Sequence, residues 1–271
     1  MENLERLSES QQYLYNKVAL GAKKRARVLL QRAELTKEQK KKLQSVKELL
    51  HTDATHPILN IDLQKVFPTS NKPVIDHLFK TGRFLNRFEF EVANDTKLGA
   101  TMQSRIMEEF LLYGATFDLI RFLSTMPNVE RPNYAAMDFI GSPNTLPMLG
   151  YYGKYRFRLK KEVFYRSTFS PGSVSSLSPE DIFTWETIQG ALLHRFPVGK
   201  DTVFLFEHIH ETVKAKRYLF QFMFIELQIL GGISLEKDVE VLYYPSVDQY
   251  TNFFEKLKGL SETFSIELHP Y

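Results

Sequence analysis

The spacing of apolar residues changes about halfway along this 271-residue chain, and that change constrains the fold more than any other feature. Residues 3–50 and 104–123 place apolar side chains at helical intervals. From about residue 129 onward, short aromatic or β-branched runs alternate with Pro, Gly, Ser or charged residues, which is typical of strands. The change predicts an α+β fold, with a helical N-terminal region at 1–80 and an α+β domain at 81–271.

Local signals add detail to this prediction. Thr36 is followed three residues later by Gln39, which fits a capping box at the start of a helix. The segment 55–73 is punctuated by prolines, and we expect it to be a connection with a short helix. Residues 178–196 predict one helix inside the strand-rich part, because Ser178 suits the N-cap and acidic residues follow it.

The composition excludes several classes of site. The chain has no cysteine, which excludes disulfides, thiolate catalysis and Cys-ligated zinc and suits a reducing cytosol. No apolar run approaches the ~20 residues that a membrane-spanning helix needs. The acidic, polar N-terminus does not have the pattern of a secretory signal. We therefore expect a folded cytoplasmic protein with no membrane span.

The net charge of +3 is small, and the positive residues cluster in two runs, KKRAR at 23–27 and KEQKKK at 37–42. Such runs can bind nucleic acid. Apolar residues at helical spacing accompany both, which favours solvated helix faces, and aromatic residues do not interleave with them as a single-strand binding groove requires. We predict no nucleic-acid partner and keep binding through 23–42 as an alternative.

One carboxylate lies within the most apolar part of the chain. In FMFIELQILGG, Glu226 and Gln228 are two positions apart, so a strand would place them on the same face. A carboxylate buried without a partner costs several kcal/mol. Glu226 is therefore either paired with a structural Arg or Lys, or it belongs to a functional site.

Further polar residues mark two other predicted strands. Arg131 precedes Pro132 at the start of one, where an arginine can clamp a phosphate or simply lie on the surface. Ser167, Thr168 and Ser170 crowd the end of the next, as turn residues or as residues that orient a catalytic group.

A metal site is not expected. His208 and His210 would share a face of a strand and could hold a metal, but a third ligand is not evident. The sequences typical of a P-loop, a dinucleotide-binding turn and a hydrolase nucleophile elbow are also missing.

Four segments in one order carry a resemblance to a known family. GRFLNRFEFEVAND (82–95), ERPNYAAMDF (130–139), YGKYRFRLKKEVFYRSTFSPGS (152–173) and FIELQILGGISLEKDVEVL (224–242) resemble a bacterial domain family of unknown function. Its members carry an RPxYGAL strand, an RxTF strand with a nearby serine, and an IEaQvHG…DVe segment. The order is also similar to the Arg…Ser…Glu plan of mono-ADP-ribosyltransferases.

The resemblance implies a split antiparallel β-core that binds NAD as a substrate. It implies that Glu226 is the catalytic carboxylate and that Gln228 assists it. The residues that it implies for NAD binding are Arg131 at the phosphates, Tyr134 as a stacking aromatic, and Ser167, Thr168 and Ser170 on the nicotinamide side. In the usual pattern the catalytic Glu follows a Glu or Gln, whereas Glu226 precedes Gln228 here; we assign Glu226 because the family segment has that order.

The function implied by the resemblance is transfer of ADP-ribose from NAD to a side chain of a host protein. Arginine is the acceptor residue we consider, and glutamate dehydrogenase is the target protein that the resemblance suggests. Such a protein would be a bacterial effector, moved from the bacterial cytoplasm into the host cytosol. The alternatives are a catalytically inactive interaction module on the same fold and an NAD glycohydrolase.

Overall fold

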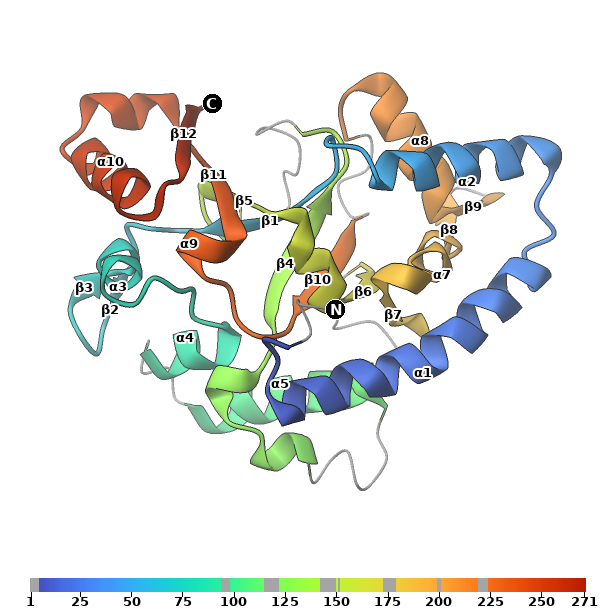
Figure 1. Ribbon diagram of the computed structural model, residues 1–271, viewed down its shortest axis with the longest axis horizontal. Helices are drawn as coiled ribbons and strands as arrows, with labels where there is room; N and C mark the ends of the chain where they lie inside the picture. Colours follow the sequence, from blue (N-terminus) through green and yellow to red (C-terminus); the bar gives the residue numbers. More distant parts are fainter. Residues whose placement is uncertain are drawn as a thin grey trace.

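The computed structural model describes residues 5–93, 98–114, 122–141, 150, 152–172, 179–198, 201–218 and 224–271. Its centre is an eight-stranded sheet with the order β12-β11-β5-β1-β4-β10-β6-β7 (Figure 1). These strands are β1 (His56–Ile61), β4 (Asn133–Asp138), β5 (Tyr155–Leu159), β6 (Ser167–Pro171), β7 (Phe183–Thr184), β10 (Ile225–Ile229), β11 (Val239–Tyr244) and β12 (Glu267–Pro270). Neighbouring strands are antiparallel except β11 and β12, which are parallel. The predicted α+β class is confirmed.

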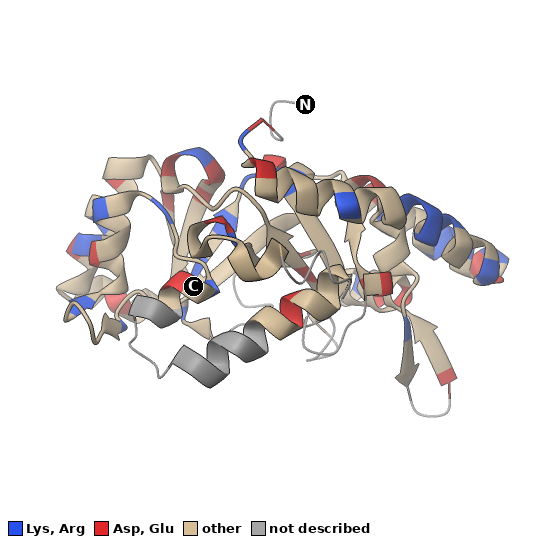
Figure 2. Cartoon of the chain, turned by 90° about the horizontal axis from the view of Figure 1, so that it is seen from below, with Lys and Arg blue, Asp and Glu red and all other residues tan. Residues whose placement is uncertain are grey.

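Two long helices open the chain. Helix α1 (Glu9–Arg32) begins at a capping box formed by Ser8 and Gln11, and α2 (Lys37–Leu50) begins at the predicted capping box of Thr36 and Gln39. Helix α1 packs against β7 and α7 (Gln189–Leu192), while α2 packs against α8 (Leu205–Ala215). The basic runs lie on the exposed faces of α1 and α2 (Figure 2). The buried alanine and leucine residues of these helices are Leu14, Ala22, Ala26, Leu43 and Leu50.

The remaining helices lie around the sheet. Helices α3 (Val74–Thr81) and α10 (Phe253–Phe264) contact each other beside the β11–β12 end (Figure 1). Helices α4 (Arg87–Ala93) and α5 (Leu98–Tyr113) contact each other at the lower end of β4 in the same view. The remaining helices are short: η1 (Asn128–Glu130), η3 (Lys161–Arg166), η5 (Pro179–Asp181), η6 (Trp185–Thr187), α9 (Leu235–Asp238) and η7 (Ser246–Tyr250). Two small sheets have two strands each. One pairs β2 (Val66–Phe67) with β3 (Lys72–Pro73), and the other pairs β8 (Arg195–Val198) with β9 (Asp201–Phe204).

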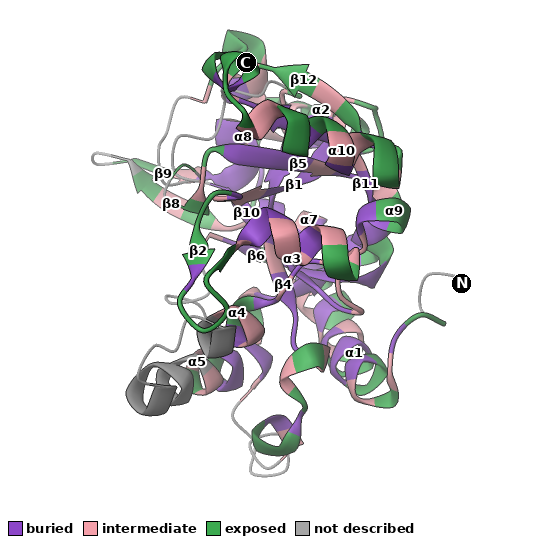
Figure 3. Ribbon diagram, turned by 90° about the vertical axis from the view of Figure 1, so that its left-hand side faces the viewer, coloured by how far each residue is buried: buried purple, intermediate pink, exposed green. Residues whose placement is uncertain are grey.

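The two faces of the central sheet differ in polarity. Successive residues of a strand point to opposite faces, so Ile225, Leu227 and Ile229 of β10 share one face. That face belongs to the main core, where Leu227 lies opposite Phe169 of β6 and the Phe169 ring packs beside Trp185. Helices and sheet enclose this buried centre, with exposed residues on the outer surfaces of the helices (Figure 3).

The opposite face of the sheet is polar. On this face, Glu226 and Gln228 are accompanied by polar residues of four other strands: Thr168 and Ser170 of β6, Tyr134 and Asp138 of β4, His56 and Asn60 of β1, and Arg156 and Arg158 of β5. We call this the polar face. Its few apolar members, Ile58, Ala136 and Phe224, form a cluster separate from the main core.

The prediction for residues 55–73 is wrong. Instead of a connection with a short helix, the segment contains β1, which pairs with β4 on one side and β5 on the other, and the β2–β3 pair. Pro57 is the second residue of β1 and has no N–H to donate, although proline is usual only at the first residue of a strand, on edge strands or at bulges. The N-terminal region 1–80, predicted to be helical with a connection at 55–73, therefore supplies an inner strand of the sheet.

Residues 178–196 do not form the single predicted helix. The described part of this segment runs through η5, β7, η6 and α7 in turn, and the predicted N-cap Ser178 lies outside the described residues. Phe183, Trp185 and Ile188 are all buried, so tertiary packing of bulky side chains decides the local structure here. In the predicted strand that contains Ser167, Thr168 and Ser170, only Ser167–Pro171 form β6, because the preceding residues Lys161–Arg166 are the 3-10 helix η3.

No helix among the described residues is both long enough and apolar enough to span a membrane.

Replacing Leu227 with Ala should lower the free energy of unfolding by about 2–5 kcal/mol, because the side chain is fully enclosed between the neighbouring strands and the main core. Chemical denaturation measures this change. Leu20→Ala is the matched control, since Leu20 is 86% exposed on α1 and should change stability little. Equal losses for the two variants would contradict the assignment of this face as the core.

Candidate functional site

The candidate site lies on the polar face where β4, β10 and β6 run side by side. Glu226 is opposite Ala136 of β4 and Ser170 of β6, and Gln228 is opposite Tyr134 and Thr168. Glu226 is buried at 7% exposure, and Gln228 is fully buried. These three strands therefore place five of the predicted site residues side by side: Glu226, Gln228, Tyr134, Thr168 and Ser170.

Gln228 is held on both sides by hydrogen bonds. The Thr168 hydroxyl donates to Gln228 Oε1 over 2.9 Å, and Gln228 Nε2 donates to Ser170 Oγ over 3.0 Å. The same Nε2 donates to Glu226 Oε1 over 3.3 Å. The prediction that Glu226 and Gln228 share a face is confirmed, and the amide links the carboxylate to two hydroxyls without neutralising its charge.

Ser167 does not join this arrangement. It lies opposite Ile229 in the pairing of β6 with β10, so it is on the apolar face with Phe169. Its hydroxyl donates to the carbonyl of Val163 over 2.7 Å, within the preceding 3-10 turn. Of the three hydroxyl residues expected to support NAD, Thr168 and Ser170 contact Gln228, whereas Ser167 has a structural bond on the other side of the sheet.

Arg131 is enclosed and paired with a carboxylate. It is 1% exposed, and its Nη1 contacts the carboxylate of Glu109 on α5. Its Nη2 donates to the Leu123 carbonyl, and its guanidinium lies 4.2 Å from the centre of the Phe88 ring. The predicted phosphate-binding role would require Glu109 to release this cation.

Glu109 is a site residue that the sequence did not single out. It accepts a weak hydrogen bond of 3.5 Å from the Tyr134 hydroxyl, so it links Arg131 to the polar face. Burial raises the pKa of Glu109 to about 7, although Arg131 opposes the shift. The available signal was the helical spacing of Ile106, Glu109 and Tyr113, which puts this carboxylate on an inward face of α5.

Two tyrosines border the same carboxylate. Burial is the largest cause that raises the pKa of Tyr113 and of Tyr134, and the charge of Glu109 adds to both shifts. Both phenols are therefore neutral hydrogen-bonding groups at physiological pH. The predicted stacking residue Tyr134 is half-buried, and it has its ring on the polar face and its hydroxyl toward α5.

The two histidines considered as metal ligands lie on a helix. His208 and His210 belong to α8 and not to a strand, so their predicted common face is wrong. His208 is buried, whereas His210 is half-buried and contacts Glu211 over 3.2 Å. Within the described ranges, no group of three His, Asp or Glu side chains is arranged to hold a metal ion.

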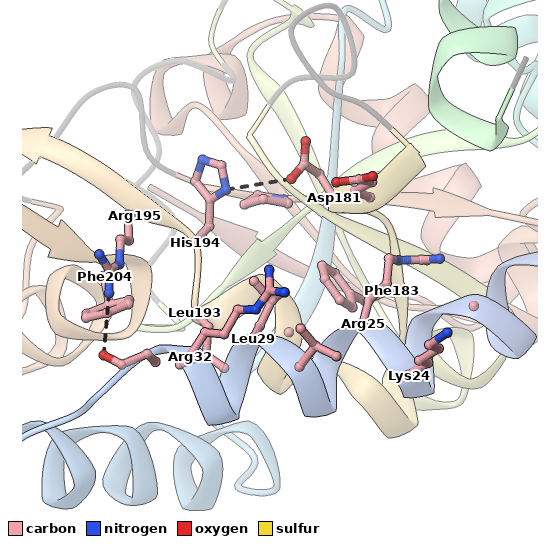
Figure 4. Close-up of a pocket in the computed structure, with 16 residues that line it drawn as sticks. Lys24, Arg25, Leu29, Arg32, Asp181, Phe183, Leu193, His194, Arg195 and Phe204 are labelled. Carbon is pink, nitrogen blue, oxygen red and sulfur yellow. Dashed lines mark hydrogen bonds and ion pairs between the residues drawn. The ribbon is translucent and has the colours of Figure 1, made fainter.

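A cavity of about 810 Å³ lies elsewhere, between α1, β7, α7 and the β8–β9 pair (Figure 4). Pro171 lines it and pairs with Ile225, which places the cavity on the apolar side of the sheet, away from Glu226. Cationic side chains from α1 and β8 reach its edge, and Arg25 and Arg195 are already bonded to the carbonyls of Ile182 and Ala33.

A scan of the sequence against models of protein families finds no matching family, and a search of curated proteins finds no match.

Arg131→Met should lower the free energy of unfolding by about 3–5 kcal/mol, because Glu109 would stay buried without its cation. The pKa of Glu109 is about 7 in the folded protein and 4.5 as its ordinary value, so the folded state binds the proton more tightly than the unfolded state. This difference stabilises the folded state fully below pH 4.5, and the stabilisation is lost as the pH rises through about 7. Without Arg131 that pKa rises further, so the loss measured by denaturation at pH 8 should exceed the loss at pH 5.

Arg131→Met with Glu109→Gln is the matched control for this pair. The double variant buries no unpaired charge, so it should recover most of the stability and lose the added pH dependence. A single Arg131 variant as stable as the wild type would show that the Glu109 contact is not structural.

Proposed function

We propose that this protein is an NAD-dependent mono-ADP-ribosyltransferase in which Glu226 is the catalytic carboxylate. The observation that supports the proposal is the Glu226–Gln228–Ser170 hydrogen-bonded chain on the polar face. It joins a carboxylate on β10 to a hydroxyl on the neighbouring β6, which agrees with the Arg…Ser…Glu plan that the sequence resembles.

The chemistry requires a carboxylate near a ribose that becomes cationic. The bond between C1′ of the ribose and the nicotinamide nitrogen breaks, and nicotinamide leaves as a neutral molecule. A side-chain nucleophile of the acceptor protein then bonds to C1′ and loses a proton. Glu226 would hold the ribose hydroxyls and stabilise the positive charge that develops between these events, so its effect is largest in the transition state.

The surroundings of Glu226 suit this role. Its carboxylate is 7% exposed, and electrostatic stabilisation is stronger where water is excluded. Gln228 is fixed by Thr168 and Ser170, so it can orient Glu226 through its amide N–H without adding a charge. The acceptor would be a side chain of a host protein; arginine and glutamate dehydrogenase are the residue and the target to test first.

Glu226→Gln should reduce transfer of labelled ADP-ribose from NAD to proteins of a host lysate by about 100-fold or more, because the charge that stabilises the ribose cation is removed. The measurement is the rate of label incorporation. Glu240→Gln is the matched control, since Glu240 is on β11 of the same sheet and pairs with Arg158 over 3.1 Å. It should retain transfer.

Each outcome of the labelling experiment decides between functions. Transfer that survives Glu226→Gln would overturn its catalytic role. Release of free ADP-ribose from NAD without an acceptor protein, and no labelling with one, would identify a glycohydrolase. No consumption of NAD under any condition would overturn the proposal and favour an inactive interaction module.

The two serines of β6 give a second matched comparison. Ser170→Ala removes a hydrogen bond that positions Gln228, and it should slow transfer about 2- to 10-fold. Ser167→Ala should leave the transfer rate unchanged and lower the free energy of unfolding by about 1 kcal/mol, because the Ser167 hydroxyl bonds only to the Val163 carbonyl. A larger loss of transfer for Ser167→Ala would contradict the assignment of faces.

A further inference from the structure

Three arginines among the described residues are buried, and only two of them have anionic partners or carbonyls to bind. Arg131 contacts Glu109, and Arg166 pairs with Asp238 over 2.9 Å and also donates to two carbonyls. Arg156 of β5 is also buried, at 7% exposure. No hydrogen bond or ion pair joins its guanidinium to another residue in the part of the chain that the structure describes, and its Nε and Nη1 are fully enclosed.

The surroundings of Arg156 contain rings and hydroxyls but no paired anion. The Tyr271 ring centre lies 5.7 Å from the guanidinium carbon. Asp138, Tyr218 and Tyr243 are near enough to act on Arg156 electrostatically, but Asp138 already accepts bonds from the Tyr218 hydroxyl and the Ile140 N–H, each over 3.0 Å. Burial lowers the pKa of Arg156 from its ordinary value, but an arginine stays charged at neutral pH.

The residue beside Arg156 on the next strand has an unused acceptor. Asn60 of β1 is directly opposite Arg156, and its Nδ2 donates to the Gly153 carbonyl over 3.1 Å. Its Oδ1 is enclosed and has no hydrogen-bond partner among the described residues. Two adjacent side chains on the polar face therefore contain enclosed donors and an enclosed acceptor that no other described residue satisfies.

A buried cation without a partner is costly, and so is a buried acceptor without a donor. Both costs disappear when a ligand supplies an anion for the guanidinium and a hydroxyl for the amide oxygen. A phosphate ester of a sugar has both groups, because the phosphate oxygens accept from arginine and the sugar hydroxyl donates to a carbonyl-type oxygen.

We propose that Arg156 and Asn60 bind the phosphate and a sugar hydroxyl of a sugar phosphate on the polar face. The identification of that ligand as the pyrophosphate and ribose of NAD rests on the proposed function. Arg156 then takes the phosphate-binding role that the sequence suggested for Arg131. Arg131 itself is paired with Glu109.

The position relative to Glu226 agrees with a nucleotide. Strands β5 and β10 are separated by β1 and β4, which is about 14 Å across three strand spacings, and Arg156 is also offset from Glu226 by two residues along the strands, so their backbones are about 16 Å apart. Both side chains are on the same face of the sheet, and both are long. A dinucleotide whose reacting ribose lies at Glu226 would cross β4 and β1 toward Arg156, and it would have to displace the Phe224 and Tyr218 side chains that pack on Ala136 and Ile58 there.

Calorimetric titration with ADP-ribose, and separately with inorganic pyrophosphate, tests the site in the full chain. Arg156→Gln should weaken ADP-ribose binding roughly 10- to 100-fold, since bonds to a charged group are lost. Asn60→Ala should weaken ADP-ribose binding but not pyrophosphate binding, because pyrophosphate has no sugar hydroxyl. Arg158→Gln removes the same charge from the same strand and face, and it should leave both affinities nearly unchanged because Arg158 is already paired with Glu240.

Thermal unfolding without ligand separates binding from folding. Arg156→Gln should have a Tm at or above that of the wild type, because it removes a buried charge that has no partner. A clear fall in Tm without ligand would overturn the inference, as would equal ADP-ribose affinity in the wild type and Arg156→Gln, equal losses in Arg156→Gln and Arg158→Gln, or no binding of either probe to the wild type.

The outcomes also separate this inference from the proposed function. ADP-ribose binding that depends on Arg156, without label transfer in any lysate, would support the sugar-phosphate site and count against the transferase. Label transfer at the wild-type rate in Arg156→Gln would overturn the site at Arg156 and leave the transferase proposal standing.

Discussion

Strand β10 lies between β4 and β6, and the alternation of its side chains commits each residue to one of two buried environments. Ile225, Leu227 and Ile229 enter the main core, whereas Glu226 and Gln228 enter a polar layer on the other face. A shift of register by one residue would place a carboxylate in the apolar core. Because that exchange costs several kcal/mol, the register of β10 is strongly specified, and the positions of its neighbours follow from it.

Several buried charges around the central sheet are paired with an opposite charge. Glu109 and Arg131 pair beneath β4, and Asp238 pairs with both Arg6 and Arg166 at the far end of β10. Such pairs contribute little net stability, but losing one partner is costly, so they restrict how the surrounding elements can pack. Arg156 departs from this rule, and a group that breaks a rule obeyed by its neighbours is a reasonable place to look for a ligand.

Where sequence reasoning succeeded, the signal was local. The capping box of Thr36 and Gln39 is confirmed because its hydrogen bonds are made within one helical turn. The common face of Glu226 and Gln228 is confirmed because a strand has a fixed period of two. Sequence reasoning failed where distant residues decide the structure. The proline at position 57 led to the prediction of a connection where the structure has the inner strand β1. Buried aromatic residues around Trp185 pack so that shorter elements form where one helix was predicted.

By itself, the sequence determined the α+β class and the placement of Glu226 beside Gln228, because hydrophobic period and strand alternation depend only on neighbours in the chain. Only the tertiary structure decided which hydroxyls meet them, because the register of β6 against β10 places Thr168 and Ser170 beside Gln228 and Ser167 opposite Ile229. It also decided that Arg131 is bound to Glu109, while Nε and Nη1 of Arg156 have no partner among the described residues. The partners of a buried charge come from strands and helices far apart in the sequence, and only the packing of the whole chain brings them together.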